Sequence, residues 1–179
     1  MIEMKNKIKE FKNTKNIVSI FDDYENTDKF SAGFIVDISD DHILLEHVSP
    51  YGLYDGFMVK EIKNVYRITY CGKYERKLDY LYKVQKQSHS KIKSLSDSVL
   101  MNLLLHAQNN KLVTTVELFD SELEDIQGYV SNISEELIVF DTVDDYGKID
   151  GKSIIKINDI TYLTCDSDKE MSIKLLSKF

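Results

Sequence analysis

Two aspartates in a recurring YGxxDG motif are the residues of this chain best suited to chemistry. Asp55 precedes Gly56 and Asp150 precedes Gly151. A carboxylate in such a position could bind a cation or act as a general base. Asp-Gly is also a preferred pair in tight hairpin turns, because glycine adopts positive φ at little cost and aspartate bonds nearby backbone. The motif therefore predicts either a carboxylate site or a local turn, and we favour the turn.

The same motif begins with a Tyr-Gly pair, Tyr51-Gly52 in the first instance and Tyr146-Gly147 in the second. The two tyrosines could be exposed aromatic side chains that bind a partner. They could equally pack over the end of a hairpin, where an aromatic ring needs no further role. We favour packing.

Histidines and cysteines do not form the spacings that metal sites use. His42 and His47 are five residues apart, which places them on opposite faces of a regular strand. Cys71 and Cys165 are too few for a disulfide framework in a chain of 179 residues and are expected to be free thiols. His89 and His106 have no cysteine partner at a ligand spacing, and the chain contains no phosphate loop, GxSxG, HExxH or CxxC motif. We therefore predict a protein without a metal, a cofactor or a catalytic activity.

The composition is that of a globular protein, with 42% hydrophobic and 30% charged residues. No apolar run approaches the roughly 18 residues that cross a bilayer, and the charged N-terminus does not resemble a signal peptide. We expect a cytoplasmic protein without membrane contact. The excess of lysine over arginine is typical of an AT-rich genome, such as that of a low-GC bacterium.

Charge divides the chain unequally. Residues 1–95 contain 16 basic and 14 acidic residues, a net charge of +2, whereas residues 96–179 contain 7 and 16, a net charge of −9. This asymmetry indicates that the two parts face different partners or attract each other, or that the acidic part only confers solubility. An acidic surface also repels nucleic acid, whose binding depends on basic side chains.

An internal repeat with an offset of 95 residues predicts the domain organisation. It contains the two YGxxDG motifs and needs no insertion over some 65 positions. The predicted units are residues 1–84 and 95–179, joined by a polar linker over residues 85–94. Identical pairs outside the motif include Gly33 with Gly128, Ile43 with Ile138, Ile62 with Ile157, Thr69 with Thr164 and Leu81 with Leu176.

Each unit shows a helical pattern followed by five short strand patterns. The second helix contains Val99, Leu103 and Leu104 at helical spacing, behind Ser96 or Asp97 as its cap. A short helix or a final strand closes each unit. The predicted strands are 17–21, 30–38, 42–48, 57–62 and 66–70, and then 112–118, 126–133, 137–143, 152–157 and 161–165.

This layout resembles the Sm-like fold and, less specifically, the Src-homology-3-type small β-barrels. The resemblance implies a mainly β (α+β) protein with two tandem barrels, each preceded by a helix, covering nearly the whole chain. Gly33 and Gly128 match the glycine of the second Sm strand. The residues that hold the nucleobase in Sm proteins are replaced by Ser39 and Ile43, by Ser134 and Ile138, and by Lys63-Asn64 and Asn158-Asp159. The resemblance therefore implies the fold without the RNA site.

Two functional hypotheses follow. The first is a non-catalytic binding or scaffold module with a protein partner, in which an oligomer is possible. The alternative is an Sm-like RNA-binding protein, which the fold resemblance favours and the charge and missing turn residues oppose.

Overall fold

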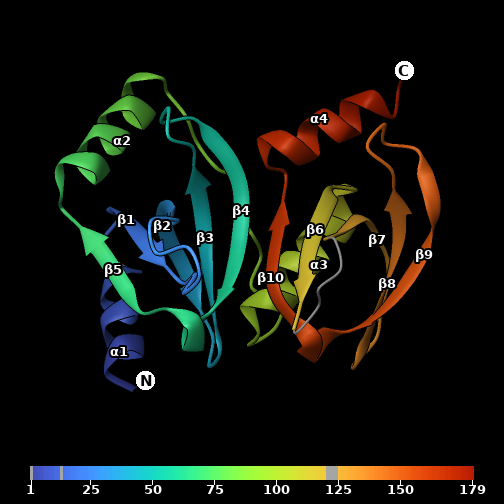
Figure 1. Cartoon of the computed structure of the whole chain (residues 1–179), viewed down its shortest axis with the longest axis horizontal. Helices are drawn as coiled ribbons and strands as arrows, with labels where there is room; N and C mark the ends of the chain where they lie inside the picture. Colours follow the sequence, from blue (N-terminus) through green and yellow to red (C-terminus); the bar gives the residue numbers. More distant parts are fainter. Residues whose placement is uncertain (1, 13, 120–124) are drawn as a thin grey trace.

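A computed structural model describes residues 2–12, 14–119 and 125–179. It is a mainly β (α+β) protein with four α-helices (Figure 1). No helix in these ranges is long and apolar enough to cross a membrane. The helices are α1 (Ile2–Phe11), α2 (Lys73–Val84), α3 (Val99–Asn110) and α4 (Asp168–Leu176), with 3-10 turns at Ile62–Asn64 and Ile157–Asp159. The strands are β1 (Ile17–Phe21), β2 (Ser31–Ile38), β3 (His42–Val48), β4 (Tyr54–Glu61), β5 (Arg67–Tyr70), β6 (Val113–Leu118), β7 (Ile126–Ile133), β8 (Leu137–Val143), β9 (Ile149–Lys156) and β10 (Ile160–Cys165).

All ten strands belong to one open antiparallel sheet, in the order β5-β1-β2-β3-β4-β10-β6-β7-β8-β9. The expectation of two tandem Sm-like or Src-homology-3-like barrels is therefore wrong. The physical reason is the choice of partner at one edge. Strand β4 pairs with β10 of the other half and not with its own β5, so the first half does not close on itself. The strands instead form a continuous sheet across the middle of the molecule (Figure 1).

Most strands lie within two residues of their predicted positions, because alternating and β-branched segments are a local signal. The exceptions are β4 and β9, which begin three residues before the predicted starts at Phe57 and Lys152. Both begin within the YGxxDG motif, so its Asp-Gly pair lies inside a strand and not in the preceding turn. The closing elements of the two halves are the helices α2 and α4.

Asp55 and Gly56 together face the single residue His47 across the β3·β4 ladder. This arrangement is a β-bulge, with glycine in the left-handed region at φ 70°. Asp150 and Gly151 form the equivalent bulge opposite Thr142 in β9, with Gly151 at φ 99°. The preference of Asp-Gly for positive φ is thus used in a bulge, where the sequence had predicted a hairpin turn.

Helix α3 places one apolar core beneath both halves of the sheet. Leu103 and Leu104 on α3 are fully buried, in a cluster that contains Val59 of β4 and Leu163 of β10. The N-cap of the helix is Ser98, whose hydroxyl accepts the Met101 N–H, so the predicted caps Ser96 and Asp97 are each too early. The two halves therefore share this part of their core.

Candidate protein interface

Asp55 joins the two halves of the sheet. Its Oδ2 lies 3.1 Å from His47 Nδ1, and its Oδ1 accepts the backbone N–H of Asp168, the first residue of α4, at 2.9 Å. Burial alone raises the pKa of this carboxyl, but the hydrogen bonds from His47 and Asp168 outweigh it and hold the pKa below its usual value. Both oxygens therefore serve contacts within the protein, which fits neither an open cation site nor a general base.

The segment after α2 is anchored beside this carboxylate by His89. Its Nε2–H donates to the carbonyl oxygens of His47 and Gly56, each at 3.0 Å, and its Nδ1 accepts the Tyr82 hydroxyl at 2.7 Å. Its ring lies 4.4 Å from that of Tyr54, centroid to centroid. Burial lowers the pKa of His89 to about 4, so the imidazole is neutral at physiological pH. The sequence offered no signal for this role, because the partners are 7 to 42 residues away.

Gly56 is required by the close passage of β10. A Cβ at this position would lie 2.3 Å from the carbonyl oxygen of Cys165 and 2.5 Å from the nitrogen of Ser167. Tyr54 makes a second contact there, because its hydroxyl donates to Asp166 Oδ2 at 2.5 Å. The first YGxxDG motif therefore lies at the pairing of β4 with β10.

The second YGxxDG motif occupies the equivalent place in β9, where no strand of the described ranges lies on the outer side. Among the described residues, a Cβ on Gly151 would meet only the Thr142 hydroxyl, at 3.8 Å. Asp150 is exposed, as are Ile149 and Ile154, which retain 61% and 70% of their accessible surface. Among the described strands β9 is an edge, paired with β8 alone. It is a sheet edge with apolar side chains and free backbone groups, the combination that a further strand can bind.

The tyrosines of the motifs lie in the loops before these strands. Tyr51 and Tyr146 are exposed, at 76% and 70%, which places them as surface aromatics and not as covered rings. The glycines that follow have positive φ, 72° at Gly52 and 74° at Gly147. A Cβ on Gly147 would lie 2.3 Å from the Ile173 carbonyl oxygen of α4, so this loop must pass close to the helix.

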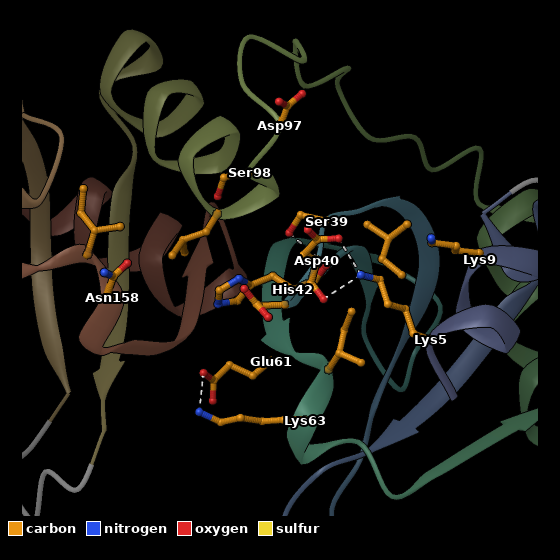
Figure 2. Close-up of a pocket in the computed structure, with 15 residues that line it drawn as sticks. Lys5, Lys9, Ser39, Asp40, His42, Glu61, Lys63, Asp97, Ser98 and Asn158 are labelled. Atoms are coloured by element: carbon orange, nitrogen blue, oxygen red, sulfur yellow. Dashed lines mark hydrogen bonds and ion pairs between the residues drawn. The ribbon is translucent and has the colours of Figure 1, made fainter. Parts of the chain in front are cut away.

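A cavity of about 1140 Å³ opens between the two halves, near the 3-10 turns (Figure 2). Its lining includes Ser39, Lys63 and Asn158, three positions of the expected Sm signatures. Two of its lysines form ion pairs, with Lys5 2.7 Å from an Asp40 carboxylate oxygen and Lys63 2.8 Å from Glu61. The lining contains three lysines and four carboxylates, so it has no excess positive charge for phosphate.

Titratable side chains of the described ranges form no group of three or more His, Cys, Asp or Glu that could hold a metal ion. His106 is distant in sequence from the other histidines and packs edge-on against Phe57. Cys165 is fully buried and burial raises the pKa of its thiol, whereas Cys71 is exposed. Neither thiol is part of a disulfide.

Comparison of the chain with protein-family models, with curated proteins and with solved structures found no match. Together with the open sheet, this result corrects the expected resemblance to a tandem Sm-like protein. Among the described elements, the exposed edge of β9 is the most distinctive surface feature of the protein.

Proposed function

We propose that the chain is a non-catalytic protein-binding module that binds a strand of its partner along the outer edge of β9. The observation that carries the proposal is the contrast between two equivalent strands. β4 is buried over most of its length by β10, whereas β9 is exposed at Ile149, Asp150, Gly151, Lys152, Ile154 and Lys156.

The direction of the free backbone groups supports strand addition. Ile157 donates its N–H to the Glu136 carbonyl of the neighbouring chain segment. Because backbone groups alternate in direction along an antiparallel ladder, those of Lys152, Ile154 and Lys156 point away from β8. A partner strand would find regularly spaced donors and acceptors there, beside the apolar side chain of Ile154.

Lys152, the charged residue in the middle of β9, does not block this edge. Lys152 is the kind of residue that natural edge strands use against unwanted pairing. Its ammonium group, however, is bound to Asp141, which lies opposite it on β8 and so on the side away from the free edge. The edge is therefore free of an unpaired charge at its centre.

Substitution of Ile154 by proline tests the proposal. Proline removes the outward N–H and leaves the β8·β9 ladder intact, since the lost donor is not part of that ladder. Ile154→Thr is the matched control, because it shortens the side chain but keeps the N–H and the strand propensity.

The measurement is affinity purification from native lysate with wild type and both variants, followed by titration with the purified partner. We expect the Ile154→Pro variant to bind the partner at least about tenfold more weakly, and the Ile154→Thr variant to bind within about threefold of wild type. Equal binding by wild type and Ile154→Pro would place the interface elsewhere and refute the proposal.

A further inference from the structure

We infer that the strand bound by the β9 edge is β5 of a second copy of this chain, so that copies assemble head to tail. This inference rests on the proposed function of the β9 edge and adds the identity of the partner. It comes from a comparison of the two halves of the sheet, which have the same internal order, β5-β1-β2-β3-β4 and β10-β6-β7-β8-β9.

The junction between the halves already shows how the two end strands fit. β4 ends the first half, β10 begins the second, and they pair antiparallel. β9 and β5 are the strands in the equivalent places, and they form the two free edges of the described sheet, at opposite ends of the molecule (Figure 1). A second copy that repeats the internal junction would therefore join β9 of one molecule to β5 of the next.

The internal pairing predicts the register of this contact. In the junction Leu163 faces Val59, and both are completely buried. The residue 95 positions before Leu163 is Ile68 of β5, and the residue 95 positions after Val59 is Ile154 of β9, so these two should face each other. The same shift of the neighbouring Thr164–Met58 pair gives Thr69 opposite Ser153. Ile154, 70% exposed in one copy, would thus be covered by an apolar side chain, as Val59 is.

The bulge in β9 has the space that such a partner needs. Gly56 lies against Cys165 at the end of β10 and Ser167 at the start of α4, whereas the described residues place only a Thr142 hydroxyl, 3.8 Å from a Cβ, in the corresponding space next to Gly151. The bend that follows β10 has a left-handed residue, Asp166 at φ 60°, and Cys71 after β5 has φ 57°. The residue after β5 therefore has the same left-handed conformation as the residue after β10, which lies next to the bulge of β4.

Charge favours the same contact. Asp55 accepts the first N–H of α4 in the internal junction, and Asp150 would meet the first N–H of α2, which belongs to Lys73. The half that carries β5 has a net charge of +2 and the half that carries β9 a net charge of −9. The Arg67 guanidinium on β5 lies over the Phe21 ring, 4.4 Å from its centroid, and so does not cover the edge.

Proline variants of each edge test the inference by sedimentation velocity of the full chain. Ile154→Pro removes an outward N–H of β9, and Tyr70→Pro removes the N–H that the predicted register directs outward from β5. Their controls are Ile154→Thr and Tyr70→Phe. A contact of four strand residues is small, so we expect wild-type self-association between about 10 μM and 1 mM.

Mixing the two variants distinguishes a head-to-tail contact from a symmetric one. Each proline variant alone should remain monomeric, while Tyr70→Phe associates as wild type does and Ile154→Thr, which shortens a covered apolar side chain, associates within about threefold of wild type. An equimolar mixture has one intact β9 and one intact β5 and should stop at a dimer. Monomeric wild type over the whole range, or a Tyr70→Pro variant that still associates with itself, would overturn the inference.

A disulfide pair provides a second measurement that does not depend on proline. In a Cys71→Ser background, Ser153→Cys chains mixed with Thr69→Cys chains should form a mixed disulfide under mild oxidation, because these residues face each other in the predicted register. Lys156→Cys in place of Ser153→Cys is the out-of-register control, and equal crosslinking by both would contradict the register.

The two proposals fail in different ways. If the wild type does not associate but a different protein is lost from Ile154→Pro, the β9 edge binds a partner and only its identity as a second copy is wrong. If Ile154→Pro changes neither self-association nor the binding of another protein, the proposed function fails as well.

Discussion

At the residue scale, the groups that first suggested chemistry are used to hold the two halves together. Asp55 connects β4 to the start of α4, and His89 connects the segment after α2 to the backbone of β3 and β4. Neither is available to a substrate in this arrangement. We therefore expect both residues to contribute to the stability of the fold.

Protonation of His89 should destabilise the protein in acid. The pKa of this buried histidine is about 4 in the folded protein, against 6.5 for an unperturbed histidine. Below pH 6.5 the unfolded chain gains a proton that the folded protein does not, so the free energy of unfolding decreases as the pH falls towards 4. At 1.36 kcal/mol for each pKa unit, acidification from pH 6.5 to pH 4 should cost up to about 3 kcal/mol of stability through this group.

Urea unfolding of wild type and His89→Gln between pH 7 and pH 4 measures this effect. Glutamine cannot titrate, so the variant should be less stable at pH 7 and should lose less stability on acidification. A constant difference between the two proteins across this range would show that His89 does not contribute the pH dependence.

Alanine at the two bulge glycines should have unequal effects. Gly56→Ala places a Cβ against the Cys165 carbonyl at a position with φ 70°, and should cost about 2–4 kcal/mol. Gly151→Ala meets open space and should cost only the backbone strain, about 1 kcal/mol. Thermal melts at low protein concentration would decide between this expectation and equal losses, which would mean that β10 does not approach Gly56 as described.

At the element scale, the decisive feature is the antiparallel pair β4·β10. It covers Val59 and Leu163 completely and brings Lys60 over the Tyr162 ring, 5.0 Å from its centroid. Lys60 also binds Asp22 at 2.7 Å, so a lysine within this pair is neutralised by a charged partner. The pair joins two five-stranded segments that would otherwise each have an additional edge.

Truncation of Leu163 should therefore weaken the whole protein. Leu163→Ala removes a fully buried side chain from the shared core and should lower the free energy of unfolding by about 2–5 kcal/mol. Leu175→Ala on α4 is the control, because Leu175 is 66% exposed and its truncation should change stability by at most about 0.5 kcal/mol. Similar effects of the two substitutions in chemical unfolding would argue against a continuous core at the junction.

At the scale of the whole molecule, charge and topology give the two ends of the sheet different properties. The half that ends in β5 is weakly basic and the half that ends in β9 is strongly acidic. Seven of the sixteen basic residues of the first half form ion pairs, among them Lys60 with Asp22 and Lys63 with Glu61. With a net charge of only +2 in this half and −9 in the other, little positive potential is left for a polyanion.

RNA binding should accordingly be weak and sensitive to salt. We expect dissociation constants no tighter than roughly 10⁻⁴–10⁻⁶ M, the range of non-specific contacts, and loss of that binding when salt is added. Fluorescence anisotropy with A-rich and U-rich oligonucleotides at two ionic strengths measures this. Submicromolar binding that tolerates salt would favour the RNA-binding alternative over a protein partner.

Local features of the fold were predictable from the sequence because they depend on neighbouring residues. Periodic apolar segments predicted the strands to within a few residues, and the Asp-Gly pairs indicated where the backbone adopts positive φ. The sequence also contains a signal that β9 is an exposed edge strand. β9 has Lys152 and Ser153 where β4 has Phe57 and Met58, a polar replacement typical of a strand exposed on one side.

The sequence by itself thus determined the strand segments, the positive-φ glycines and the unequal charge of the two halves. Only the tertiary structure decided that β4 pairs with β10 and that His89 anchors the segment between the halves. The physical reason is that every strand edge offers the same backbone donors and acceptors, so local residue patterns do not specify which edge is bound. That choice follows from non-local packing, here the apolar face of α3 beneath both halves, which makes the continuous sheet the arrangement that buries Val59 and Leu163.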